Sequence, residues 1–125
     1  MAVLHLLYIE DEPDHRNLVT WVLSDAGWDV KSVSTIEEAG PLLEQSWPHM
    51  VLLDLHLGWS ATEAGFDTLR TIKEAYPDLP VVVTSVSDFP DWTQRALALG
   101  AAAFIRKPVK IEGIDAQLRR LVAGV

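Results

Sequence analysis

The sequence has no cysteine, no excess of positive charge and no long apolar run. The lack of cysteine excludes disulfides and thiolate metal sites, and it is compatible with the cytoplasmic location that we expect. A net charge of −8 is unfavourable for nucleic-acid binding, which depends on clustered Lys and Arg. The one small basic cluster, Arg119 and Arg120, is typical of a solvated helix face. No apolar run approaches the roughly 18 residues of a membrane helix, and no signal peptide is evident. We therefore expect no direct binding of nucleic acid and no membrane association.

Length and composition predict one domain that spans residues 1–125. The 125 residues are 49% hydrophobic and 22% charged, a balance typical of a globular chain that can bury a core. The last predicted helix reaches almost to Val125. The sequence leaves open whether this domain stands alone or is part of a longer protein.

Short apolar runs alternate with segments of helical periodicity. The apolar runs predict strands at Val3–Ile9, Trp28–Val33, Met50–Leu53, Val81–Thr84 and within 101–108. The periodic segments predict helices from Pro13 to a stop at Gly27, from Ser34 or Thr35 to about Ser46, around 66–76, over 88–100 and from about Ile111. Pro41 lies inside the second of these helices, so we expect it to kink or delay that helix.

The strand runs are continuously apolar, which is typical of parallel strands covered by helices on both faces. Five strand–helix units with right-handed crossovers predict an α/β fold, a doubly wound five-stranded parallel sheet. The strand order expected at this length is 2-1-3-4-5, the flavodoxin-like order. In this order ligands bind at the carboxyl ends of the strands, where the first and third strands part.

Charged and polar residues follow four of the predicted strands. Glu10 and Asp11 follow the first strand, Asp54 the third, Ser85 the fourth, and Lys107 the fifth. Three carboxylates in one crevice repel each other, so a divalent cation is expected among them. Oxygen ligands, with no His or Cys expected nearby, favour magnesium over zinc. A magnesium ion and a lysine beside one acid predict a pocket in which a carboxylate carries a phosphoryl group.

Each of these residues also has a simpler interpretation. The acidic run that begins at Glu10 precedes a helix and is compatible with complementing its dipole alone. Asp54 alone is compatible with a turn residue, Ser85 with a structural role and Lys107 with a solvated amine. Their joint position at successive strand ends favours the functional interpretation over these separate ones.

Four segments resemble the signature blocks of the response regulator receiver domains of two-component signalling. They are "LLYIEDEP", "VLLDLHLG", "PVVVTSVSD" and "GAAAFIRKP", and the resemblance covers essentially the whole chain. It implies a receiver fold in which Asp54 is the phosphoacceptor. It also implies that Mg2+ is bound by Glu10, Asp11, Asp54 and the backbone carbonyl of His56. The residues that it assigns to phosphoryl binding and switching are Ser85, Lys107 and Phe104, with Val86 and Pro108 in supporting positions.

The sequence departs from the family pattern at several positions. Glu10 replaces the more common Asp, and Val86 replaces a usual Ala or Gly, which we expect to narrow access to the phosphoryl group. Gly58 stands where proline is common, and the segment from Asp54 to Gly65 is about three residues longer than usual. Trp59 in this segment is predicted either to cover the mouth of the site or to be an ordinary exposed or packed tryptophan.

The resemblance implies that a sensor histidine kinase or a histidine phosphotransfer protein donates the phosphoryl group to Asp54. The new charge would switch the fourth helix and fifth strand toward a downstream protein partner. Such a domain catalyses its own phosphorylation and slow dephosphorylation, and is not otherwise an enzyme. A homodimer through the fourth helix and fifth strand, or through the first and last helices, is compatible with the family.

Two alternatives remain open from the sequence. One is a magnesium-dependent phosphohydrolase with an aspartyl nucleophile, although His56 stands where such enzymes place a second acid. The other is a receiver-like scaffold that only binds proteins. The sequence does not identify the kinase, its signal, the downstream output, the oligomeric state, the phosphorylated lifetime or the role of residues 55–64.

Overall fold

The structure is a computed structural model that describes residues 3–55, 62–86, 91–107 and 109–123. Strands and helices alternate along the whole chain. The strands are β1 (His5–Ile9), β2 (Asp29–Val33), β3 (Met50–Asp54), β4 (Val81–Ser85) and β5 (Ala103–Arg106). The helices are α1 (Pro13–Asp25), α2 (Ile36–Glu44), α3 (Thr62–Ala75), α4 (Trp92–Ala98) and α5 (Ile114–Ala123).

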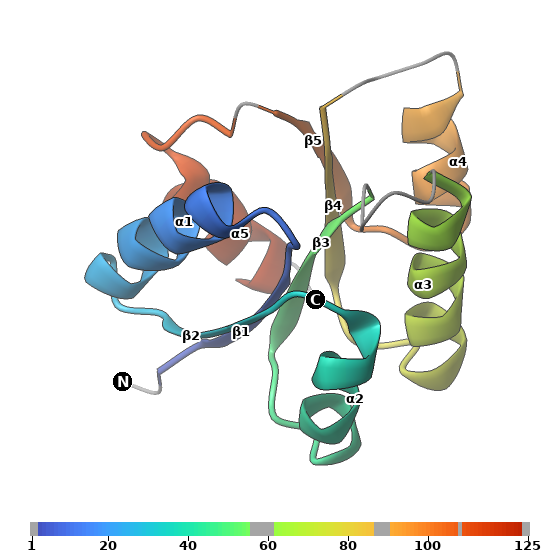
Figure 1. Ribbon diagram of the computed structural model, residues 1–125, viewed down its shortest axis with the longest axis horizontal. Coiled ribbons are helices and arrows are strands. Elements are labelled where there is room, and N and C mark those ends of the chain that lie inside the picture. Colours follow the sequence, from blue (N-terminus) through green and yellow to red (C-terminus); the bar gives the residue numbers. More distant parts are fainter. Residues whose placement is uncertain (1–2, 56–61, 87–90, 108, 124–125) are drawn as a thin grey trace.

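The five strands form one parallel sheet in the order β2-β1-β3-β4-β5, which confirms the predicted fold (Figure 1). β1 pairs with β3 so that Ile9 lies opposite Leu53, and β3 pairs with β4 so that Asp54 lies opposite Thr84. These registers bring the carboxyl ends of β1, β3 and β4 to one edge of the sheet.

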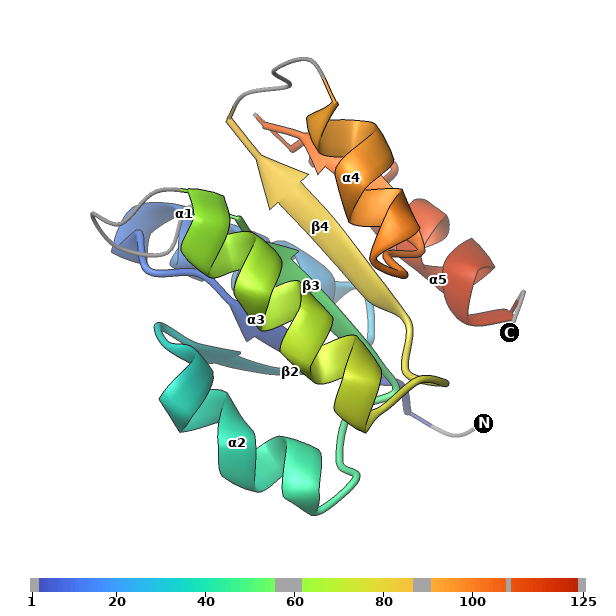
Figure 2. The same cartoon turned by 90° about the vertical axis from the view of Figure 1, so that its right-hand side faces the viewer.

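Helices cover both faces of the sheet, with α1 and α5 on one face and α2, α3 and α4 on the other (Figures 1 and 2). Alternate strand residues face opposite layers, because successive side chains of a strand point to opposite sides. In β1, Leu7 and Ile9 pack with the α2–α4 layer, while Leu6 and Tyr8 pack with the α1–α5 layer. Both faces are therefore buried, as continuous apolar strands require.

Several boundaries differ from the predictions by a few residues. β1 begins at His5, two residues later than expected, and α5 begins at Ile114 after a turn. Pro41 does not delay α2, which begins at Ile36 and continues past the proline to Glu44. α1 ends at Asp25, and Gly27 adopts a φ of 103°, the left-handed conformation that favours glycine after a helix.

Across the described residues, no helix combines the length and the apolar character that crossing a membrane requires.

Candidate functional site

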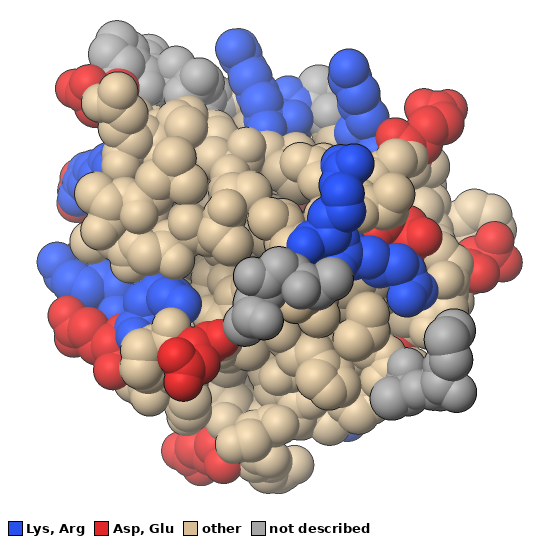
Figure 3. Space-filling model, turned by 180° about the vertical axis from the view of Figure 1, so that it is seen from behind, with Lys and Arg blue, Asp and Glu red and all other residues tan. Residues whose placement is uncertain are grey.

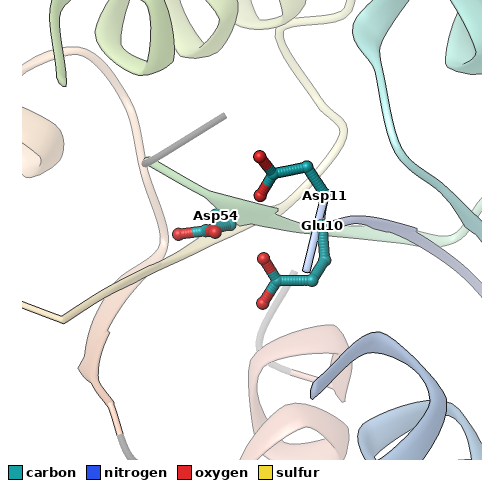
Figure 4. A group of neighbouring side chains, drawn as sticks. All are labelled: Glu10, Asp11 and Asp54. Atoms are coloured by element: carbon teal, nitrogen blue, oxygen red, sulfur yellow. The ribbon is translucent and has the colours of Figure 1, made fainter. Parts of the chain in front are cut away.

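Three acidic side chains meet at the carboxyl edge of the sheet. One carboxylate oxygen each from Glu10, Asp11 and Asp54 lies within 4.8 Å of the others, and the three side chains point into the same space (Figure 4). Glu10 is fully buried, Asp54 is 2% exposed and Asp11 is half-buried. The acids that the sequence analysis singled out are therefore neighbours in space.

Strand pairing explains why these acids converge. Asp54 is the last residue of β3, and Glu10 follows β1, whose last residue Ile9 pairs with Leu53. Arg16 anchors the end of β1 by donating from Nη1 to the Glu10 carbonyl at 2.9 Å. The position of the acids is thus set by the sheet and by the first turn of α1.

Lys107 enters the same cluster from the end of β5. Its Nζ lies 2.6 Å from Glu10 Oε1 and 3.2 Å from Asp54 Oδ2, and the side chain is only 11% exposed. Its backbone N–H donates to the Ser85 carbonyl at 2.8 Å, which ties the β5 end to the β4 end. This ammonium group thus pairs with two of the three carboxylates, Glu10 and Asp54.

Glu10 shows how this environment acts on a buried acid. Burial acts to raise the pKa of Glu10, but it is outweighed by a hydrogen bond that Glu10 accepts when Asp54 is protonated and by the hydrogen bond and positive charge of Lys107, so the pKa lies below its usual value. Glu10 Oε1 is close to Lys107, whereas Oε2 is buried and has no hydrogen-bond partner among the described residues. A buried carboxylate oxygen without a donor is suited to a cation, and an all-oxygen set suits magnesium.

The acidic run that follows β1 divides between two tasks. The Glu12 side chain caps α1 by accepting from the backbone N–H groups of Asp14 and His15. Glu10 and Asp11 instead belong to the acidic cluster. Complementing the helix dipole therefore explains Glu12, but it does not fully explain Glu10 and Asp11.

The expectation that no histidine lies near the acids was wrong. His15 Nε2 lies 3.7 Å from Glu10 Oε1, because the first turn of α1 folds back over the end of β1. Burial and the positive charge of Lys107 lower the pKa of His15, so the imidazole is neutral at neutral pH. The group of possible cation ligands among the described residues still consists of the three acids and does not include His15.

Residues of β4 and β5 complete the surroundings. Ser85 ends β4 and is fully buried, while Phe104 in β5 is half-buried and packs against the α2–α4 core. Val86 is 58% exposed and, with Glu12, His15 and Lys107, lines a hollow of about 460 Å3 beside the acids. Val86 therefore borders the site on its open side.

Some predicted residues lie outside the described part of the chain. They are the backbone carbonyl of His56, Gly58, Trp59 and Pro108. Their predicted roles stay predictions.

The sequence analysis missed Tyr8, whose ring is 1% exposed and whose hydroxyl donates to Glu10 Oε1 at 3.4 Å. The signal was a tyrosine inside an otherwise aliphatic strand run, two residues before the first acid. Strand alternation places residues 8 and 10 on the same side, so the contact could have been anticipated.

Comparison with protein families gives one assignment over most of the chain. The pattern of the response regulator receiver domain matches residues 6–119. An NtrX-like response regulator of Rickettsia bellii is 29% identical over 120 residues, which cover 96% of this chain and 25% of the relative. The response regulator protein PilR of Pseudomonas aeruginosa is 32% identical over 94% of this chain and 25% of its own length. This chain spans about a quarter of the length of these relatives.

Solved structures agree with this assignment. NtrX of Brucella abortus, in complex with ADP, superimposes with a TM-score of 0.85 at 29% identity and covers 98% of this chain and 27% of that protein. A CheY-like receiver domain from Methanospirillum hungatei has a TM-score of 0.87 over 98% of this chain and 96% of its own. Its identity is 18%, so this likeness concerns the fold alone.

Proposed function

The chain belongs to the response regulator receiver domains of two-component signalling, and we propose that it accepts a phosphoryl group on Asp54. The observation that carries this proposal is the position of Asp54, 2% exposed, 3.2 Å from Lys107 and beside two further acids. On this proposal residues 1–125 form the receiver domain.

In the proposed reaction an Asp54 carboxylate oxygen attacks the phosphorus of a phosphohistidine. The new P–O bond forms while the P–N bond breaks, and the leaving imidazole keeps the electron pair and takes up a proton. Lys107 is placed to neutralise phosphoryl oxygens, because its ammonium already lies within 3.2 Å of an Asp54 oxygen. Slow hydrolysis of the acyl phosphate then resets the domain.

Glu10, Asp11 and Asp54 would hold Mg2+, together with the backbone carbonyl of His56. The bound ion supplies positive charge that offsets the acids and the incoming phosphoryl group. The support is the all-oxygen cluster and the unpartnered Oε2 of Glu10. Among the described residues, Lys107 brings a positive charge to the same place.

The proposed switch runs from the site to β5 and α4. Phosphorylation adds charge next to Ser85 and Lys107, whose backbones are joined by a hydrogen bond of 2.8 Å. Ser85 would donate its hydroxyl to the phosphoryl group, and Phe104, one strand away, would change its packing against the α2–α4 layer. Val86 and Pro108 would support this region.

We propose a sensor histidine kinase or a histidine phosphotransfer protein as donor and a protein as downstream partner. NtrX and PilR are response regulators that are several times longer than this chain. This difference in length supports a receiver that controls either a further domain of the same protein or a separate protein partner. Homodimers through α4 and β5, or through α1 and α5, remain predictions.

Labelling by acetyl phosphate tests the proposal. We expect wild type and Asp78→Asn, an aspartate distant from the acidic cluster, to gain a phosphoryl group that intact-mass spectrometry detects. Asp54→Asn should gain none, because the nucleophilic carboxylate is gone. Equal labelling of Asp54→Asn would overturn the assignment.

Steady turnover of small phosphate esters by the wild type would favour the phosphohydrolase alternative instead, and a wild type that accepts no phosphoryl group from any donor would favour the scaffold.

A further inference from the structure

Tyr8 is a buried polar residue that the proposed phosphoryl chemistry does not use. It lies in β1 with its ring packed in the α1–α5 core, and only 1% of the residue is exposed. A buried tyrosine hydroxyl needs a hydrogen-bond partner. The acceptor that the structure provides is Glu10 Oε1, at 3.4 Å.

The two oxygens of Glu10 have very different surroundings. Oε1 receives Lys107 Nζ at 2.6 Å and the Tyr8 hydroxyl at 3.4 Å, and His15 Nε2 lies 3.7 Å away. Oε2 is buried and has no hydrogen-bond partner among the described residues. Donors that converge on one oxygen fix the rotation of the carboxylate about its terminal bond, and so determine the direction of the other oxygen.

We propose that Tyr8 is a positioning residue for the cation site, which holds Glu10 Oε1 and thereby fixes the orientation of the Glu10 carboxylate within the cluster that it forms with Asp11 and Asp54. This inference rests on the proposed function, since it assumes that the acidic cluster binds Mg2+. Tyr8 touches neither the phosphoryl group nor the ion and acts through Glu10 alone. Residues that orient a metal ligand in this way support its affinity strongly.

A purely structural role does not explain the hydroxyl. Phenylalanine would fill the same space without placing a polar group in the core, which is costly. A tyrosine hydroxyl is protonated at neutral pH, so toward a carboxylate it can only be a donor. The hydroxyl is thus kept in the form that can hold Oε1.

Calorimetry of Mg2+ binding to the metal-free protein tests the proposal. Tyr8→Phe should weaken Mg2+ affinity about tenfold, the lower end for a residue that orients a ligand, because 3.4 Å is a long hydrogen bond. Tyr76→Phe is the matched control, since Tyr76 is the other tyrosine and directly follows α3, outside the site. The control should bind Mg2+ like the wild type.

A double-mutant cycle with Glu10→Asp separates positioning from general damage. Aspartate is one carbon shorter and withdraws its carboxylate from the Tyr8 hydroxyl. Tyr8→Phe should then change Mg2+ affinity by less than about twofold in the Glu10→Asp background. An equal loss in both backgrounds would show a structural effect and overturn the inference.

Labelling kinetics give a second readout. For Tyr8→Phe the Mg2+ concentration at half-maximal labelling by acetyl phosphate should rise about tenfold, while the rate at saturating Mg2+ should match the wild type. A lower labelling rate at saturating Mg2+, with an unchanged Mg2+ concentration at half-maximal labelling, would contradict a role in cation positioning. Wild-type Mg2+ affinity in Tyr8→Phe, with normal labelling of the wild type, overturns this inference but leaves the proposed function intact. A wild type that neither binds Mg2+ nor is labelled overturns both.

Discussion

At the scale of single residues, Lys107 connects groups that are far apart in the sequence. Its ammonium lies between Glu10 Oε1 and Asp54 Oδ2, so the two acids compete for one cation. A phosphoryl group on Asp54 would bring more negative charge to the lysine than either carboxylate does. Lys107 is therefore the residue best placed to sense the change in charge at Asp54.

Lys107→Ala should separate cation binding from switching. We expect Mg2+ affinity to change less than about threefold, because lysine pairs with the acids and is not a metal ligand. The response of β5 and α4 to beryllofluoride, a phosphoryl mimic, should be lost in amide NMR spectra. Lys110→Ala, an exposed lysine, should keep that response. A normal spectral response of Lys107→Ala would refute the role.

At the scale of elements, the start of α3 is held closely against the end of β3. A Cβ placed on Gly65 would lie 2.1 Å from the Leu55 carbonyl oxygen, so only glycine allows this approach. Arg95 of α4 forms two hydrogen bonds of 2.7 Å to Glu63 of α3 and lies 4.1 Å over the Phe66 ring. The helices that follow β3 and β4 are thereby linked directly.

Gly65→Ala should destabilise the domain by about 2 kcal/mol or more, because backbone must move to admit the methyl group. The matched control is Gly40→Ala in α2, where an added Cβ meets nothing within 4 Å. That substitution should stabilise by up to about 1 kcal/mol through helix propensity. Urea unfolding measures the free energy of unfolding of the two variants. Equal values would show that α3 can move away from the end of β3 at little cost in stability.

Arg95→Ala should loosen α4 from α3. Amide hydrogen exchange in α4 should become faster, because both hydrogen bonds to Glu63 and the contact with Phe66 are lost. Arg70→Ala is the control, since Arg70 pairs with Asp67 inside α3 alone. Unchanged exchange in Arg95→Ala would mean that apolar packing of Trp92 on Phe66 suffices to hold the helix.

At the scale of the whole molecule, charge is distributed unevenly. The net charge is −8, yet five of the ten Lys and Arg residues lie in 106–120, and three of them, Arg106, Lys110 and Arg120, line a pocket of about 300 Å3 at β5 and α5. Figure 3 shows Lys and Arg side chains gathered over the upper and central part of the face seen from behind. Three of the 18 Asp and Glu residues meet at the site, where a bound cation would offset their mutual repulsion.

Mg2+ should therefore raise the melting temperature of the wild type. Binding to the folded state alone adds about 2.7 kcal/mol when the ion is at 100 times its dissociation constant. Asp11→Asn should lose most of this gain, because a hard oxygen ligand is neutralised. When neither protein has Mg2+, Asp11→Asn should melt at a higher temperature than the wild type. Differential scanning calorimetry with and without Mg2+ measures both effects. An equal Mg2+ shift in Asp11→Asn would place the ion elsewhere.

The sequence by itself determined the strands, the helices and the order of the sheet. Continuous apolar runs such as Val81–Thr84 are local signals, and alternation with helical periods leaves few topologies. It also determined that Glu10, Asp11 and Asp54 would meet, since parallel strands end at one edge. These inferences needed periodicity and connection rules but no side-chain geometry.

Only the tertiary structure decided how the side chains share their partners. Lys107 reaches Glu10 across 97 residues of sequence, and that contact depends on the register of four strands. The division between Glu12 as helix cap and Glu10 as buried acid depends on where α1 begins. The approach of His15 to Glu10 Oε1 depends on the packing of α1 over the end of β1. Distances of this kind are set by packing between elements, which no local pattern encodes.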